Sequence, residues 1–189
     1  LGRGDGTFLP QQVVPVGGQP HGLVVFDADG DGDPDIATAN TTGNNVSLLL
    51  NNGSGVFGPA TSFDSGGSGE YSLGAGDMDN DGIADLVVGV RTPDQIRILR
   101  GLGDGTFAFR SGMASGGGPW MVVVGDLDGD GNLGVTSANG GGAHGALLRG
   151  NGDGTLQPAV THGIASDAIS TDLGDLDGDG DLDWILASY

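Results

Sequence analysis

An acidic loop motif recurs four times along the chain, and its spacing constrains the fold more than any other feature. The motif reads Asp-x-Asp-x-Asp-Gly, and its copies begin at Asp27, Asp77, Asp126 and Asp175. Successive copies are 50, 49 and 49 residues apart. A repeat of this length is typical of chains that stack one small structural unit after another. We therefore interpret the chain as a single array of four repeats, in which the last is incomplete: 1–50, 51–100, 101–149 and 150–189.

A second turn motif has the same period, and the segments between the motifs resemble strands. The turn Gly4-Asp5-Gly6-Thr7-Phe8 returns near Gly53, Gly103 and Gly152. Each repeat also contains short apolar segments that are rich in Val, Ile and Leu and bounded by Gly, Asp or Asn, as strands are. In the first repeat these segments are residues 12–16, 23–26, 36–39 and 46–50. No segment of about ten residues or more has a helical period.

Four short strands in a repeat of this length predict an all-β fold made of β-propeller-type blades, each with four antiparallel strands. A β-solenoid and an unrelated array of sandwiches are the alternatives. The glycines of this chain are then turn residues rather than a sign of disorder, because they follow the period of the repeat.

The composition limits the partners and the compartments that fit this chain. Acidic residues outnumber basic ones by 25 to 6, and the formal net charge is −19. This charge disfavours binding to nucleic acid or to an anionic membrane. There is no cysteine, so no disulfide framework exists. No apolar stretch reaches the length of about 18 residues that a membrane span needs, so we expect no membrane insertion.

The acidity is concentrated in the four loops, which predicts metal binding. Of the 24 Asp residues, 17 lie in these loops. Alternate Asp residues at loop positions 1, 3 and 5 can direct their carboxylates to one centre. Gly at position 6 permits the sharp turn. Position 7 can offer its backbone carbonyl, and the residue at position 9 closes the site. The candidate ligands are Asp27, Asp29, Asp31, Asp33 and Asp35; Asp77, Asp79, Asp81, Ile83 and Asp85; Asp126, Asp128, Asp130 and Asn132; and Asp175, Asp177, Asp179, Asp181 and Asp183.

Hard oxygen ligands favour Ca²⁺, and we expect three to four structural ions. An EF-hand is excluded, because its loop needs Glu at position 12, where this chain has Thr38, Val88, Ser137 and Leu186. Asp-Gly turns without metal are the alternative. The third loop has Gly134 at position 9 in place of Asp, so we expect a weaker site there, or one completed by water.

The loops, the Gly-Asp-Gly-Thr-Phe turns and strands such as Asp85-Leu-Val-Val-Gly resemble the FG-GAP/VCBS repeats of integrin α-subunit propellers and of many secreted bacterial and fungal proteins. The resemblance covers the whole chain. It implies that each Asp loop joins the first two strands of a blade and holds one Ca²⁺. It also implies a propeller of about seven blades, so that this chain is either part of a longer array or is completed by another copy of itself.

Other residues are candidates for recognition or modification. His21, Glu70 and Trp120 precede the second apolar segment of their repeats, as Ile169 does in the fourth, and they form a possible ligand face. An exposed Trp there would suit a sugar ring or a protein partner, whereas a Trp packed between blades is the alternative. The sequons at Asn40, Asn45 and Asn52 are possible glycosylation sites.

We therefore predict an extracellular, Ca²⁺-stabilised array that is not an enzyme and that mediates adhesion or recognises a glycan or an extracellular protein. One alternative is a structural repeat protein whose copies assemble into a fibre or surface layer. Another is an accessory domain of a secreted hydrolase.

Overall fold

The computed structural model describes residues 1–189 and confirms the all-β fold, with three four-stranded antiparallel sheets and one two-stranded sheet. No helix of the structure is long and apolar enough to cross a membrane. The first sheet contains β1 (Pro20–Phe26), β2 (Asp35–Asn40), β3 (Asn45–Leu49) and β4 (Thr61–Phe63). The second contains β5 (Ser68–Gly76), β6 (Asp85–Thr92), β7 (Asp94–Gly101) and β8 (Phe107–Ala114). The third contains β9 (Gly118–Asp126), β10 (Leu133–Gly140), β11 (His144–Leu148) and β12 (Val160–Gly163), and the fourth contains β13 (Ala168–Gly174) and β14 (Asp183–Ser188).

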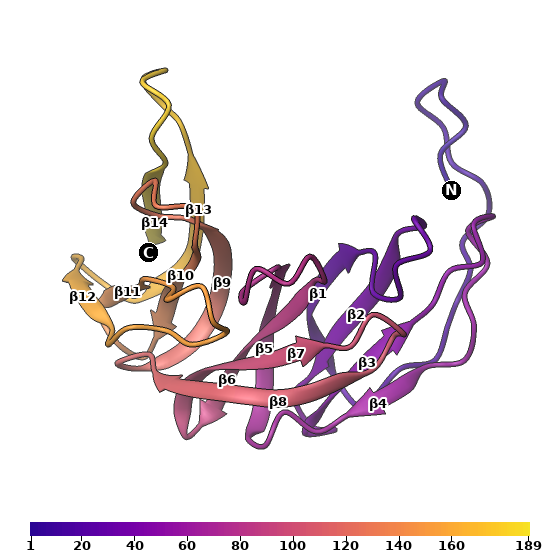
Figure 1. Cartoon of the computed structure of the whole chain (residues 1–189), viewed down its shortest axis with the longest axis horizontal. Helices are drawn as coiled ribbons and strands as arrows, with labels where there is room; N and C mark the ends of the chain where they lie inside the picture. The colour runs from indigo at the N-terminus through magenta and orange to yellow at the C-terminus, as the bar shows by residue number, and fades with distance from the viewer.

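The sheets follow one another in an open arc, with the two chain termini at opposite ends of it (Figure 1). The first strands of successive sheets lie next to each other, so that β1 contacts β5, β5 contacts β9, and β9 contacts β13. The second and third sheets thus each present one face to the sheet before and the other to the sheet after, as propeller blades do.

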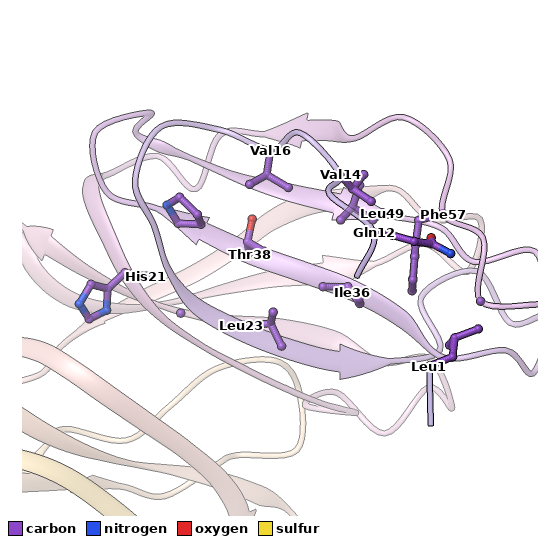
Figure 2. A pocket seen from close by; sticks show the side chains of 13 residues that line it. Leu1, Gln12, Val14, Val16, His21, Leu23, Ile36, Thr38, Leu49 and Phe57 are labelled. Carbon is purple, nitrogen blue, oxygen red and sulfur yellow. The ribbon is translucent and has the colours of Figure 1, made fainter. Parts of the chain in front are cut away.

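The boundaries of the sheets are offset by one strand from the sequence repeats. The segments that follow the last three glycine-rich turns become the last strands of the preceding sheets, as Thr61–Phe63 does when it pairs with β3. The equivalent segment 12–16 forms no strand, so that prediction was wrong. Its Val14 and Val16 instead line a cavity of about 490 Å³ over Ile36 and Leu49, on the face of the first sheet (Figure 2).

The core consists of two layers, one on each face of the second sheet, which is buried on both faces. Leu86, Val88 and Val90 of β6 pack against the first sheet, whereas Val87 of the same strand packs against the third. Side chains alternate between the faces of a strand, so a strand buried on both sides reads as a continuous apolar run. This explains the sequence Leu86-Val-Val-Gly-Val90.

The two sequence motifs share one period because they meet in space. The Asp loop of the first sheet is bonded to the glycine-rich turn of the second sheet, since the N–H of Gly105 donates to the carbonyl of Ala28 (3.2 Å). The N–H of Gly154 donates in the same way to the carbonyl of Met78 (2.9 Å). Ala28 and Met78 are themselves buried in the core. Each of these loops therefore connects one sheet to the next.

We predict that Gly22→Ala destabilises the protein by about 1–3 kcal/mol, because overpacking a close contact forces backbone to move. An added Cβ at Gly22 would lie 2.8 Å from the Cα of Ser72 and 2.8 Å from the carbonyl oxygen of Tyr71 on the neighbouring sheet. Gly174→Ala is the control, because Gly174 also lies in a first strand and has nothing within 4 Å of such a Cβ. Chemical denaturation of both variants measures the difference, and equal stabilities would contradict the prediction.

Candidate metal centres

Each Asp loop connects the first and second strands of its sheet and is curled by its own first residue. In the first loop the N–H groups of Gly30 and Gly32 donate to the two carboxylate oxygens of Asp27 (2.8 and 2.9 Å). Position 6 needs a backbone that glycine adopts without strain, with φ of 88° at Gly32 and 86° at Gly82. Sequence alone therefore places the turn correctly.

The loops bring carboxylates together in four clusters. Within each cluster, one oxygen of each of three Asp residues lies within 4.8 Å of the others. In three loops the members are positions 1, 3 and 9, and in the third loop they are positions 1, 3 and 5. The clusters are Asp27, Asp29 and Asp35; Asp77, Asp79 and Asp85; Asp126, Asp128 and Asp130; and Asp175, Asp177 and Asp183.

The position-9 carboxylate has a structural role as well. The side chain of Asp85 is buried and accepts hydrogen bonds from the N–H of Met78 (3.0 Å) and of Gly101 (2.8 Å). Asp35 accepts equivalent bonds from Ala28 (2.9 Å) and Asn51 (2.8 Å). Each of these two carboxylates thus joins the start of its loop to the end of the third strand of its sheet.

The third loop lacks this carboxylate, and its structure explains why a side chain is missing there. A Cβ at Gly134 would lie 2.7 Å from the carbonyl oxygen of Leu148 and 2.8 Å from Cδ1 of Leu127. Asp130 at position 5 takes the third place in the cluster instead. The expected weakness of this site remains a prediction.

The other predicted ligands lie outside these three-carboxylate clusters. Position-5 side chains of the other loops accept hydrogen bonds from the N–H two residues later, as Asp31 does from Asp33 (2.9 Å) and Asp81 from Ile83 (2.9 Å). The remaining predicted ligands outside the clusters are Asn132, Asp179 and Asp181. Asp179 accepts from Asp181 (2.9 Å), and Asp130 accepts from Asn132 (2.8 Å).

Two arginines that are not among the predicted ligands contact the clusters. Arg100 pairs with Asp79 (2.9 Å) and Asp81 (2.7 Å), and Arg149 pairs with Asp128 (3.0 Å). Arg100 is near the end of β7 and Arg149 directly follows β11, so both lie at the end of a third strand, 49 residues apart. The first loop has Leu50 at the equivalent position, so it has no such basic partner. Their spacing by one repeat was the signal in the sequence.

The environment shifts the pKa of several loop carboxyls. Burial raises the pKa of Asp85 to about 6, and the neighbouring Asp79 and Asp81 add to the shift. Burial also raises the pKa of Asp29, where Asp31, Asp35 and Asp27 contribute. The hydrogen bond from Arg100 lowers the pKa of Asp81. Burial in the first place, and the neighbouring carboxylates in addition, thus make the charged form of Asp85 unfavourable.

The predicted ligand face needs a correction. Glu70 is buried and its carboxylate accepts a hydrogen bond from the hydroxyl of Ser65 (2.6 Å), so it does not lie on an exposed face. A bulge in β5 places Tyr71 beside His21 and Trp120 instead. Of these three side chains, His21 is exposed and the two others are partly buried.

The three sequons differ in accessibility. Asn40 is buried and its amide donates to the side chains of Asn45 (2.7 Å) and Ser47 (2.8 Å), so a glycan at Asn40 is incompatible with this fold. Asn45 is partly buried, whereas Asn52 is exposed. Glycosylation of Asn45 and Asn52 remains a prediction.

A family model described as "FG-GAP-like repeat" matches residues 27–88 and 77–135, which together are more than half of the chain. The chain belongs to this family. No curated protein sequence matches it.

Solved structures resemble the fold. Two are crystal structures of BBS1N in complex with ARL6DN, one soaked with mercury and one with lead. Their TM-scores are 0.57 and 0.56, their identities 17% and 16%, and the alignments cover 85% and 80% of this chain. The chain spans 45% and 46% of the length of those chains. At this identity the likeness concerns the fold alone.

Without metal, we predict that Asp85 makes stability depend on pH. Its pKa in the folded protein, about 6, exceeds the ordinary value of 3.8. The fold therefore favours the protonated form, and the stability that this proton contributes is present below about pH 4 and is lost as pH rises through 6. Melting temperatures in excess chelator measure this loss, and Asp85→Asn, which is neutral throughout, removes part of it. An unchanged pH dependence in that variant would contradict the assignment.

Proposed function

We propose that this chain is a calcium-binding, non-catalytic recognition module that works outside the cell. The observation that carries the proposal is the set of four carboxylate clusters, which recur at the same place in every sheet. Their donors are hard oxygens in short loops, the ligands that Ca²⁺ prefers. The residues that would hold the ions are the twelve clustered Asp residues given above, with backbone carbonyls and water completing each shell.

Electrostatics supports a cation at these sites. Three carboxylates within 4.8 Å of each other repel one another unless a positive charge lies between them. In the second and third loops an arginine supplies part of that charge, but the first loop has no arginine partner. A bound Ca²⁺ would neutralise the cluster and stabilise the junction between sheets, because any ligand that binds only the folded state adds to its stability.

The compartment and the task follow from the same chemistry. Extracellular modules bind calcium with dissociation constants of about 10⁻⁴–10⁻³ M, which suits small carboxylate loops. The strongly acidic charge fits a chain whose partners are neither nucleic acid nor anionic membrane. A repeat array presents side chains from successive sheets on one surface, which suits adhesion or the recognition of a glycan or an extracellular protein.

Chelation tests the proposal. We expect excess EGTA to lower the melting temperature, and Ca²⁺ to restore it with more effect than Mg²⁺, which demands a stricter octahedral shell. Calorimetric titration of the chelated protein should show three to four sites. A melting temperature that is the same in EGTA and in millimolar Ca²⁺ would overturn the proposed role of the loops.

We further predict that Arg100→Leu tightens calcium binding at the second loop by severalfold or more. The substitution copies Leu50 of the first repeat and removes a positive charge that pairs with Asp79 and Asp81. The same variant should melt at a lower temperature than the parent protein in EGTA, because the carboxylates lose their partner.

Calorimetry measures the affinity of this variant, and Arg3→Leu is the control, because Arg3 lies in an exposed turn and makes no ion pair. Weaker calcium binding in Arg100→Leu would contradict the prediction.

A second candidate function is self-assembly into a fibre or surface layer. It is favoured by apolar side chains that the arc leaves exposed on its first and last sheets, among them Leu23 and Val25 (60% and 55% exposed) and Ile185 (41% exposed). The open cavity described above lies on the face of the first sheet that carries Leu23 (Figure 2). Size in solution separates the two functions, since filaments favour assembly and a monodisperse monomer favours recognition.

A further inference from the structure

The first strands of the first three sheets carry a row of stacked aromatic side chains. Each first strand has a bulge near its start, and the bulged residues are His21 in β1, Tyr71 in β5, Trp120 in β9 and Ile169 in β13. The rings of His21 and Tyr71 have centroids 3.5 Å apart, and those of Tyr71 and Trp120 are stacked at 5.5 Å. We call His21, Tyr71 and Trp120 the aromatic row.

One ring of the aromatic row packs against the backbone of the third sheet. The indole of Trp120 lies against the backbone of Gly140, where an added Cβ would be only 2.0 Å from its Nε1 atom. A side chain at residue 140 would therefore displace the ring. Because its position is fixed by this contact, the Trp120 ring can receive a ligand at little cost in conformational entropy.

One arginine, Arg91, lies beside the aromatic row. The guanidinium carbon of Arg91 lies 5.5 Å from the ring centre of Tyr71 and 5.9 Å from that of Trp120. Arg91 is exposed and makes no ion pair, whereas Arg100 and Arg149 pair with the Asp loops. Asp94 lies in the same hairpin, but its carboxylate is not within 4.0 Å of an arginine nitrogen. The guanidinium is thus available to an anionic ligand.

A small pocket opens at the row. Its volume is about 290 Å³, and its lining includes the three rings together with Ser72, Met121 and Ile169. Arg91 is not part of this lining; its guanidinium lies beside it, against the rings of Tyr71 and Trp120. Ligand pockets for drug-sized molecules begin at about 300 Å³, so this one suits a single small ring. It lies at the start of the first strands, whereas the Asp loops follow their ends, about 20 Å away at the rise of a strand. At physiological salt this distance exceeds the screening length of about 8 Å, so the repulsion between the acidic loops and an anion here is largely screened.

We propose that the aromatic row and Arg91 form a binding site for an acidic sugar, a pyranose that bears a carboxylate. The exposed ring of His21 at the end of the row can stack on the apolar face of a sugar ring, and a guanidinium binds a carboxylate through two parallel hydrogen bonds. The proposal rests on the proposed recognition function, and it names the residues and the ligand class that would carry it. A neutral sugar would use the rings but leave Arg91 without a partner.

The test uses two probes that differ only in the carboxylate, methyl glucuronide and methyl glucoside, titrated into the calcium-loaded chain with tryptophan fluorescence and calorimetry as readouts. We expect the glucuronide to bind at least tenfold more tightly. Arg91→Gln should remove that preference, whereas Arg3→Gln, with the same loss of charge in an exposed turn, should keep it. Tyr71→Leu should weaken both probes by tenfold or more, with melting temperature as the check that this variant folds.

The outcomes separate this site from the proposed function. Equal binding of the two probes, or an unchanged preference in Arg91→Gln, would overturn the acidic-sugar site. Binding of neither probe by a chain that calcium still stabilises would overturn the site and leave the calcium-dependent module standing. Capture of a protein by the aromatic row without binding of either sugar would also overturn it. A chain that calcium does not stabilise would overturn the proposed calcium role, whatever the sugars do.

Discussion

The carboxylate at position 9 of the Asp loop is the interaction on which the first two sheets depend. The buried side chain of Asp85 accepts hydrogen bonds from the start of its loop and from the end of the third strand. Asp35 does the same in the first sheet. Ala28 and Met78 donate to these carboxylates through their N–H groups. Their carbonyls in turn accept a hydrogen bond from the glycine-rich turn of the next sheet. A metal at the same carboxylates would therefore act on contacts within a sheet and between sheets together.

This arrangement places several carboxylates close together, and their negative charges repel one another. A buried carboxylate with both oxygens bonded is well satisfied, yet burial and neighbouring acids still raise the pKa of Asp85 to about 6. The chain offsets the repulsion in two ways, by arginine in the second and third loops and, in our proposal, by calcium. The loops then differ in how much they need a cation, and the first and fourth loops, whose carboxylates have no arginine partner, depend on it most.

The architecture separates the contacts that stabilise the fold from the site of the proposed recognition along each first strand. The strand ends in an Asp loop that joins sheets, and it begins with a bulge whose side chain is free of that task. A bulge turns one residue out of the alternating pattern of the strand. Side chains at this place can therefore vary without disturbing the core, which is why His21, Tyr71 and Trp120 can form a surface of their own.

The sequence alone determined the repeat, the blade class and the positions of the Asp loops, because these depend on local turn chemistry and on a period that is visible in one dimension. Only the tertiary structure decided that Asn40 is buried, that segment 12–16 forms no strand and that Tyr71 rather than Glu70 joins the aromatic row. A strand needs a neighbouring edge, and a bulge shifts every later side chain by one position. Both depend on the partner strand, and no pattern within a single segment encodes it.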